Sequence, residues 1–379
     1  MTTDILVAGA GPAGLATARA LALAGRSVTV LDADPASSAG SGLTLWPNAL
    51  AALRQLGIPG VQEAARPCAG MRVSRPDGSV LQYLDPDTMT VACGGNGHAI
   101  TRAALMAELR KALPDSVTVH AAVLRSVELD GELVRAGTDQ GGHAGRVLVG
   151  ADGAHSTVRR VLTGEDGSRR LGMRVIRGLS TTTLADYPAQ VTMGRGVQFG
   201  IFALSEGTYW FAAYPASRAL ASAADSVRAL FAGWHQPIEE LVATTPAECW
   251  LSHDVFDRKP PGAVWGRAAV TLVGDAAHLA APTMGQGTCH AFEDALALAN
   301  ALAGTLEPAA LRRYEAARAP RATALVKRSH LAAVAGQWRS PLVCAGRDLM
   351  MKATPARSQI RQLRTMFTFS AADVLAASG

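Results

Sequence analysis

The sequence is short of cysteine and charge and has no long apolar run, and each shortage argues against a class of protein. Its 379 residues hold an odd number of cysteines with no Cys-x-x-Cys pair: Cys68, Cys93, Cys249, Cys289 and Cys344. This pattern argues against a disulfide framework and a zinc site, so we expect no bound metal and a cytoplasmic location. No stretch of about 18 uncharged apolar residues occurs, which argues against a membrane-spanning helix.

Charged residues make up only 18% of the chain, against 49% hydrophobic residues, and this balance argues against disorder. The length suits two closely packed domains. The net charge of +5 is spread along the chain, without the basic run of a nucleic-acid-binding arm. No basic region precedes the first apolar run, so we expect no signal peptide.

The N-terminal segment has the pattern of a β-α-β unit of about 30 residues. Residues 5–8 form a short apolar run, residues 12–24 are rich in alanine and leucine, and residues 27–31 are apolar and β-branched. These patterns predict a buried parallel strand, a helix that stops at Gly25, and a second strand.

Later segments predict antiparallel sheet and basic helices. Residues 71–98 contain a hairpin around a Pro-Asp-Gly turn, and residues 198–214 alternate around a Ser-Glu-Gly turn. We expect a single helix, residues 224–244, to interrupt this β-rich region. Residues 307–335 and 345–367 predict C-terminal helices that turn a solvated, charged face outward, with membrane association as the alternative.

A Gly-x-Gly-x-x-Gly motif joins the first strand to the first helix, and its residues are Gly9, Gly11, Pro12, Ala13 and Gly14. Gly9 permits the tight turn, Gly11 lets a pyrophosphate approach the backbone, and Gly14 allows the helix to pack on the strand. Asp32 closes the second strand, where its carboxylate can accept hydrogen bonds from ribose hydroxyls. Together with the free N–H groups of the helix start, these features predict dinucleotide binding. A plain structural loop and a surface carboxylate are the alternatives.

Two further pairs of glycine and acid follow predicted strands. The first is Asp152-Gly153, after residues 147–149, and the second is Gly274-Asp275, after residues 269–273. The second pair leads into a loop, residues 282–287, with the sequence Pro-Thr-Met-Gly-Gln-Gly. In each case an acidic residue follows the predicted strand and lies in a flexible loop that precedes a helix N-terminus.

These three motifs, in this order, resemble the single-component FAD-dependent monooxygenases of the para-hydroxybenzoate hydroxylase type. Arg102, behind the expected helix N-cap Thr101, and residues 41–49 fit as well, and the likeness covers residues 1–330. It implies an α/β fold with a Rossmann-like, three-layer FAD-binding domain, an inserted, mainly antiparallel α+β substrate layer, and C-terminal helices. The expected boundaries are 1–70, 99–170 and 262–330 for the FAD domain, 71–98 and 171–261 for the substrate domain, and 331–379 for the C-terminal helices.

The resemblance also implies roles for residues at matching positions. Asp275 would bind a ribityl hydroxyl of FAD, Leu124 would lie near adenine, and Pro282 would lie beside the flavin ring on the substrate side. Negative charge gathers at N1 and C2=O of the reduced flavin, and the helix N-terminus at residues 285–287 suits it. The expected cofactor-binding residues are Gly9, Gly11, Pro12, Ala13, Gly14, Asp32, Arg102, Leu124, Asp152, Gly153, Gly274, Asp275, Pro282, Gly285, Gln286 and Gly287.

The chain departs from the family's pattern at three places. Asp32 stands where Glu is more common, Ala33 where many members have Arg, and the sequence Thr-Cys-His at residues 288–290 where Ala-Asn is common. The first two departures would weaken FAD retention, and the third would alter the pocket near the flavin. His278 is a candidate general base, but the family carries this histidine in a structural role.

Strand alternation in residues 198–214 predicts the surface that faces the substrate. Gln198, Gly200 and Phe202 would share one face, with Trp210 opposite them and Pro282 on the flavin side. Family members that take carboxylated aromatics often place arginine on this sheet. A carboxylate without a partner is costly to bury, so we expect a neutral, flat and fairly apolar substrate. The alternative is that this face only fills core space.

The resemblance implies bound FAD, transient NADPH or NADH, and hydroxylation of an aromatic small molecule through a C4a-hydroperoxyflavin. Epoxidation, Baeyer–Villiger insertion and a non-oxygenating reductase are the alternatives, and no residue is assigned as catalytic base. The tryptophans form no Trp-x-Trp motif, which argues against a flavin-dependent halogenase. The Gly-Asp loop is kept, which argues against a protein that binds FAD without catalysing a reaction. We expect a monomer or homodimer without nucleic-acid or stable membrane association.

Overall fold

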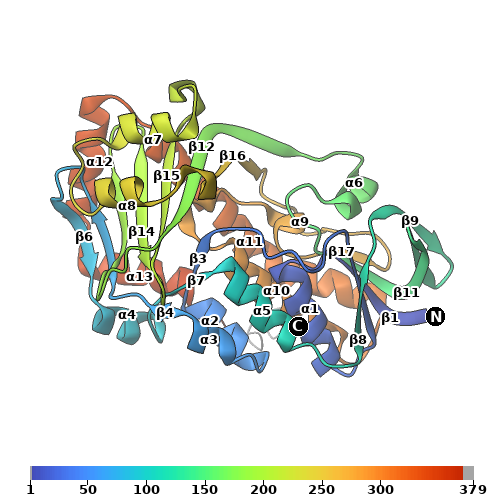
Figure 1. The fold of residues 1–379 in the computed structure, drawn as a ribbon. Helices are drawn as coiled ribbons and strands as arrows, with labels where there is room; N and C mark the ends of the chain where they lie inside the picture. The colour runs from blue at the N-terminus through green and yellow to red at the C-terminus, as the bar shows by residue number, and fades with distance from the viewer. Residues whose placement is uncertain (1, 370–379) are drawn as a thin grey trace.

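Two seven-stranded sheets stand side by side in the computed structural model, which describes residues 2–369 (Figure 1). The first sheet has the order β8-β2-β1-β11-β10-β9, with β17 also paired to β11. Its parallel strands are β1 (Thr2–Ala8), β2 (Val28–Asp32), β8 (Val117–Ala121), β11 (Gly141–Gly150) and β17 (Val270–Leu272). The antiparallel hairpin at its edge consists of β9 (Leu124–Asp130) and β10 (Leu133–Thr138).

The predicted β-α-β unit is confirmed as β1, α1 (Pro12–Leu23) and β2. Proline suits the first turn of α1, because the N–H that it lacks would have no partner within the helix. Strand β1 is buried on both faces of the sheet, because Ile5, Leu6 and Val7 have no solvent exposure. On its other side α1 packs against α10 (Gly287–Leu302), which the chain reaches only after completing the second sheet.

The second sheet is mainly antiparallel and has the order β16-β12-β15-β14-β13-β5-β6. Its strands are β5 (Met71–Ser74), β6 (Val80–Leu84), β12 (Ser168–Ser180), β13 (Ala189–Met193), β14 (Gln198–Ala203), β15 (Thr208–Pro215) and β16 (Leu251–Arg258). The hairpins predicted within residues 71–98 and 198–214 are confirmed as β5–β6 and β14–β15.

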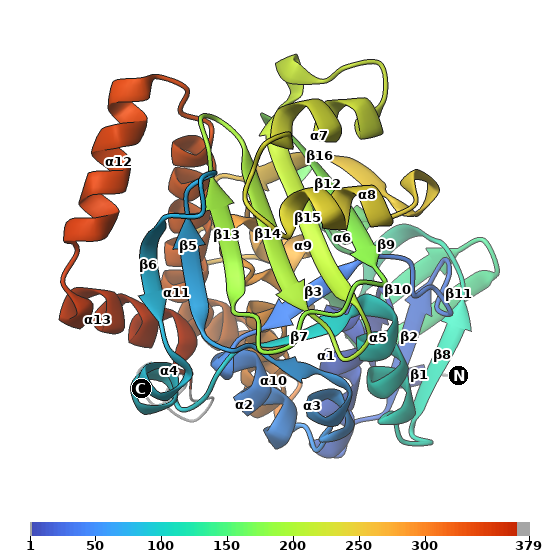
Figure 2. The ribbon, with the colours of Figure 1, turned by 60° about the vertical axis from the view of Figure 1, so that its left-hand side comes forward.

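Two short helices cover the outer face of the second sheet (Figure 2). They are α7 (Ala223–Phe231) and α8 (Ile238–Thr244), so the single helix expected over residues 224–244 is wrong. Gly233 adopts φ +75° between them, and Pro237 has no N–H for a continuing helix.

Smaller elements connect the two sheets. A three-stranded sheet contains β3 (Gly42–Leu45), β4 (Arg66–Pro67) and β7 (His98–Thr101). Thr101 caps α5 as predicted, because its hydroxyl accepts a hydrogen bond from the Ala104 N–H at 3.1 Å. The remaining helices before α10 are α2 (Pro47–Gln55), α3 (Gly60–Ala64), α4 (Pro86–Cys93), α5 (Arg102–Lys111), α6 (Thr157–Thr163) and α9 (Asp275–His278).

Three helices end the described chain: α11 (Pro308–Gly336), α12 (Pro341–Ala353) and α13 (Ala356–Phe367). The helix expected over residues 345–367 is therefore two helices, separated at Pro355. The expectation of an outward, charged face is wrong for α12, which buries Arg347 and Asp348 and exposes leucines. No helix within residues 2–369 is both long enough and apolar enough to cross a membrane.

Candidate active site

Each glycine of the glycine-rich turn is required for a different geometric reason. Gly9 adopts φ +105°, and a Cβ there would press on the Ala151 carbonyl. A Cβ at Gly14 would overlap the carbonyl oxygen of Gly9, so only glycine lets α1 pack this closely on β1. A Cβ at Gly11 would meet only the Arg102 guanidinium, 4.0 Å away. The turn is therefore open at Gly11, on the side of a pocket.

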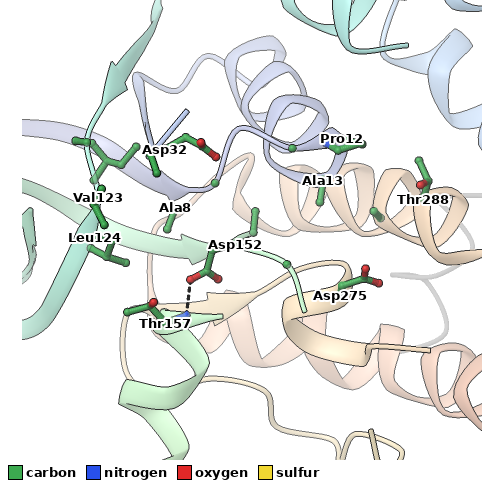
Figure 3. Close-up of a pocket in the computed structure, with 18 of the residues that line it drawn as sticks. Ala8, Pro12, Ala13, Asp32, Val123, Leu124, Asp152, Thr157, Asp275 and Thr288 are labelled. Atoms are coloured by element: carbon green, nitrogen blue, oxygen red, sulfur yellow. Dashed lines mark hydrogen bonds between the residues drawn. The ribbon is translucent and has the colours of Figure 1, made fainter. Parts of the chain in front are cut away.

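That pocket has a volume of about 460 Å³ and lies where β1, β2, β11 and β17 end (Figure 3). Its wall contains these residues named from the sequence: Gly9, Gly11, Pro12, Ala13, Asp32, Arg102, Leu124, Asp152, Gly153, Asp275 and Gly287. It also contains residues that sequence reasoning did not assign: Ala8, Leu31, Ala33, Ala122, Val123, Ala151, Thr157, Thr288 and Ala291. Most of these flank a motif residue along the chain, which was the available signal.

Two carboxylates in the wall are partly engaged by backbone N–H groups. Asp32 accepts from the N–H of Ala10 at 2.6 Å and from that of Asp34 at 2.7 Å. Asp152 uses Oδ2 to accept from the N–H groups of Thr157 and Val158, at the start of α6. Its buried Oδ1 has no partner among residues 2–369. A buried acceptor without a donor suits a ligand hydroxyl.

Asp275 and Arg102 both line the pocket, and their opposite charges act on each other. Burial raises the pKa of the Asp275 carboxyl, against the lowering effects of His278, Arg258 and Arg102. Burial lowers the pKa of Arg102, and the nearby Asp275 opposes that change. A cation beside an open turn and a helix N-terminus favours a phosphate, and Asp275 favours a hydroxyl.

Some residues named from the sequence do not line this pocket: Gly14, Gly274, Pro282, Gly285 and Gln286. Gly274 and Gly285 have positive φ values of 58° and 60°, which glycine adopts without strain. The Gly274 N–H donates to Asp294 Oδ2 at 2.9 Å, so a buried acid on α10 holds this turn.

Asp294 is the centre of a fully buried cluster. Its Oδ2 also lies 2.6 Å from His278 Nε2, and its Oδ1 accepts from Arg318 Nε at 2.7 Å. Burial opposes ionisation of Asp294, but His278 and Arg318 outweigh it and hold its pKa well below the usual range. His278 is only 1% exposed and is bound to this acid, a placement that suits a structural histidine and not a general base.

Glu293 extends this cluster to the loop of residues 282–287. Its carboxylate accepts from Asn48 Nδ2 at 2.7 Å, and the same amide donates to Gln286 Oε1 at 3.0 Å. Arg318 and Arg321 contact Glu293 at 2.8 and 2.7 Å. The loop is thus held by a charged network that begins on α10 and α11.

The β14–β15 register corrects the predicted substrate face. Phe202 lies opposite Tyr209, and Ile201 opposite Trp210, so Trp210 is on the other face from Gln198, Gly200 and Phe202. It is fully buried under α7 and α8, where it stacks on Phe199 at 5.4 Å. The assignment of Trp210 to the substrate pocket is therefore wrong.

The inner face carries aromatic rings and one arginine that sequence reasoning missed. Phe202 stacks on Tyr209 at 5.5 Å, and Phe211 is the one residue of β15 that is not fully buried. Arg177 on β12 lies directly opposite Phe211 in the ladder. This face packs against the loop before Pro282 through the cluster of Phe211 and Ala281, and a Cβ at Gly42 would overlap the Tyr209 ring.

Arg177 is half-buried, and its buried Nε has no hydrogen-bond partner among residues 2–369. No acid within that range forms an ion pair with it. Burial, followed by the charge of Arg177, lowers the pKa of neighbouring His253 to about 4. The expectation of an uncharged substrate assumed a face without arginine, and that premise is wrong.

This fold and pocket define an FAD-binding protein. The family model described as FAD binding domain matches residues 2–329, and the chain belongs to this family. It is 34% identical to aurachin C monooxygenase/isomerase of Stigmatella aurantiaca, over 92% of this chain and 93% of that protein. It is 35% identical to 3-amino-4-hydroxybenzoate 2-monooxygenase PtmB3 of Streptomyces platensis, over 86% of each.

Among solved structures, Klebsiella pneumoniae HpxO complexed with FAD and uric acid superposes with a TM-score of 0.88. The two are 26% identical, and the match covers 96% of each chain. The protein is an FAD-dependent monooxygenase, with NAD(P)H and O2 as co-substrates. The unpartnered Asp152 oxygen and the open turn at Gly11 fit the hydroxyl and phosphate groups of FAD.

Proposed function

We propose that the protein hydroxylates an electron-rich aromatic small molecule held between its flavin loop and the inner face of the second sheet. One observation carries this proposal. The pocket that fits FAD includes Asp275, Gly287 and Thr288, and Phe211 of the aromatic face shares a cluster with Ala281, next to the loop of residues 282–287. A flat ring would lie between two flat surfaces, which is the arrangement that oxygen transfer from a flavin needs.

Different residues around the pocket would bind different parts of FAD. The N-terminus of α1 and Gly11 would hold the pyrophosphate, Asp32 the ribose, Asp152 and Asp275 the ribityl hydroxyls, and Leu124 the adenine side. When bound, FAD accepts hydride from NAD(P)H and activates O2.

The start of α10 would face the pyrimidine edge of the flavin. Gly287 is its first residue, and the first N–H groups of a helix have no partners within the helix. These groups and the helix dipole would stabilise negative charge on the reduced ring. Thr288 in the pocket wall and His290 behind it replace the residues common in the family. Burial lowers the pKa of His290 to about 3, so this histidine is neutral at pH 7 and adds no charge.

Arg177 would bind an oxygen of the substrate that carries negative charge, such as a carboxylate, a phenolate or an enolate. Its buried Nε, which has no partner within residues 2–369, supports this role, because a buried donor needs a partner, and Arg177 lies opposite Phe211 in the ladder. A phenolate held there is also more electron-rich than the phenol. The β14–β15 ladder places no acid or histidine beside Phe211, whereas His253 on β16 shares the face of Arg177.

Oxidation of NADPH and NADH by the FAD-loaded protein tests the proposal. The panel contains salicylate, salicylamide, simple phenols and 2-alkyl-4-quinolones, with hydrogen peroxide and product mass followed together. We expect one class to stimulate oxidation and to yield a product heavier by one oxygen, with little peroxide. Product structure then distinguishes a hydroxylated ring from an epoxide or a ring-inserted lactone. Bound FAD without stimulation by any aromatic compound would contradict the proposal.

A further inference from the structure

Helix α12 is inverted relative to an ordinary surface helix, because its charged residues face the protein and its apolar residues face out. Leu342, Leu349 and Met350 are 85%, 68% and 64% exposed, and Val343 is exposed on the same side. Arg347 and Asp348 are buried. Surface helices normally bury the apolar side.

Polar contacts fix α12 in this orientation. Asp348 accepts from Arg75 Nε on the β5–β6 turn at 2.7 Å, and from Arg347 Nη2 at 2.8 Å. Arg347 also donates to the Gly194 carbonyl at 3.3 Å, and Gln82 on β6 donates to the Met351 carbonyl at 3.0 Å. Rotating α12 to bury its leucines would break its contacts with Arg75, Gly194 and Gln82, so its outward apolar side belongs to the fold.

The end of α11 adds a second apolar stripe. Leu331 and Val334 lie one turn apart on α11, Trp338 follows just after the end of this helix, and all three are exposed. The Cys344 thiol lies 3.2 Å from the Trp338 carbonyl and brings the two helices together at their junction. These three residues and the four apolar residues of α12 are called the C-terminal apolar surface below. Figure 2 shows α12 at the outer edge of the second sheet, beyond β6.

The segment that carries the C-terminal apolar surface is strongly basic. Residues 316–367 contain a single acid, Asp348, and it is already paired and buried. The exposed bases of this segment are Lys327, Arg328, Arg339, Lys352, Arg357, Arg361 and Arg364. The apolar surface therefore lies on a strongly basic segment, with Asp77 of the adjacent β5–β6 turn as a neighbouring exposed acid, and it suits a partner that is both apolar and anionic.

We propose that the C-terminal apolar surface docks reversibly on an anionic lipid bilayer. Leucine, methionine and tryptophan side chains enter the boundary between headgroups and acyl chains, while the surrounding Lys and Arg bind anionic headgroups. A second copy of the chain fits less well, because two-fold contact through this surface would bring like charges together. Docking would place the edge of the substrate sheet at the membrane, where lipophilic aromatic compounds concentrate.

Flotation of the full-length, FAD-loaded protein with vesicles tests the proposal. Vesicles of phosphatidylglycerol and phosphatidylcholine are compared with pure phosphatidylcholine, at low and high salt. We expect binding to the anionic vesicles alone, and its loss at high salt. The double variant Leu349→Ser/Met350→Ser should bind about tenfold more weakly, while its melting temperature and activity on soluble substrate stay unchanged.

The matched control replaces two exposed leucines of the first sheet's domain, Leu23→Ser/Leu129→Ser, and should float like the wild type. Charge reversal through Lys352→Glu/Arg357→Glu should also weaken vesicle binding. The proposal is overturned by absence of binding, by equal binding to neutral vesicles, or by equal binding of the Leu349→Ser/Met350→Ser variant. A lipid-free dimer that this variant dissociates would assign the surface to a second copy and overturn it too.

Discussion

Replacing Asp294 with asparagine should destabilise the protein far more than the same replacement in a surface ion pair. Asp294 accepts from the Gly274 N–H, contacts His278 Nε2 and accepts from Arg318 Nε, all without solvent access. Asparagine keeps the volume of the side chain, so no cavity is added to the effect. Asparagine keeps one accepting oxygen, but its NH2 group cannot accept, so in either orientation it loses donors on one side.

The expected magnitude follows from the charge balance of the cluster. Arg318 and Arg321 are matched by Glu293 and Asp294, and Asp294→Asn leaves one buried positive charge in excess. Breaking a buried pair from one side costs about 3–5 kcal/mol, and the remaining contact of Arg318 with Glu293 favours the lower end. A loss of about 3 kcal/mol lowers the melting temperature of a chain of this length by about 4 °C.

Asp130→Asn is the control, because Asp130 pairs with Arg135 Nε at 2.6 Å with both side chains more than half exposed. That exposed pair contributes less than about 1 kcal/mol. Thermal melts of both variants, with and without FAD, measure the difference. Asp294→Asn should also release FAD more readily, because the turn before Asp275 loses its anchor. Equal melting temperatures for the two variants would refute the reasoning.

Three further predictions concern residues of the pocket and its surroundings. Gly14→Ala should lower the melting temperature of the apoprotein, whereas Gly11→Ala should leave it unchanged and weaken only FAD binding, which titration of flavin fluorescence checks. Between pH 7 and 4.5 the wild type should lose about 2 kcal/mol of stability more than the His290→Asn variant. Burial lowers the pKa of His290 to about 3, so over this pH range the histidine takes up a proton in the unfolded chain but not in the folded one. Equal loss of stability in denaturation curves of the two proteins would contradict this prediction. Arg177→Gln should raise KM for an anionic aromatic substrate about tenfold without changing that for its neutral amide, and an equal effect on both would remove Arg177 from substrate recognition.

Local patterns predicted those parts of the fold in which neighbours along the chain decide the structure. The Gly-x-Gly-x-x-Gly turn and the first β-α-β unit depend on residues within about 30 positions of each other, and both appear as expected. The β14–β15 hairpin was also predicted, but the face of Trp210 was not. A shift of one residue in pairing sends a side chain to the opposite face, and the register depends on the loop geometry around Gly207.

Features made by distant segments gave no usable signal. Arg177 joins the substrate face because β12 pairs with β15, more than 30 positions further along the chain. The inversion of α12 was also hidden, because helical periodicity separates an apolar side from a polar one without saying which side is inward. The contacts of α12 with distant residues, such as that of Asp348 with Arg75, decide it.

The packing of α1 against α10 has a consequence for biosynthesis. The ribosome synthesises residues 12–23 long before residues 287–302. Helix α1 therefore lacks its packing partner α10, and the FAD pocket stays incomplete, until most of the chain has emerged. The second sheet has all its strands by residue 258 and can mature first. Capture of the flavin therefore has to wait until residues 287–302 have emerged and closed this wall of the pocket.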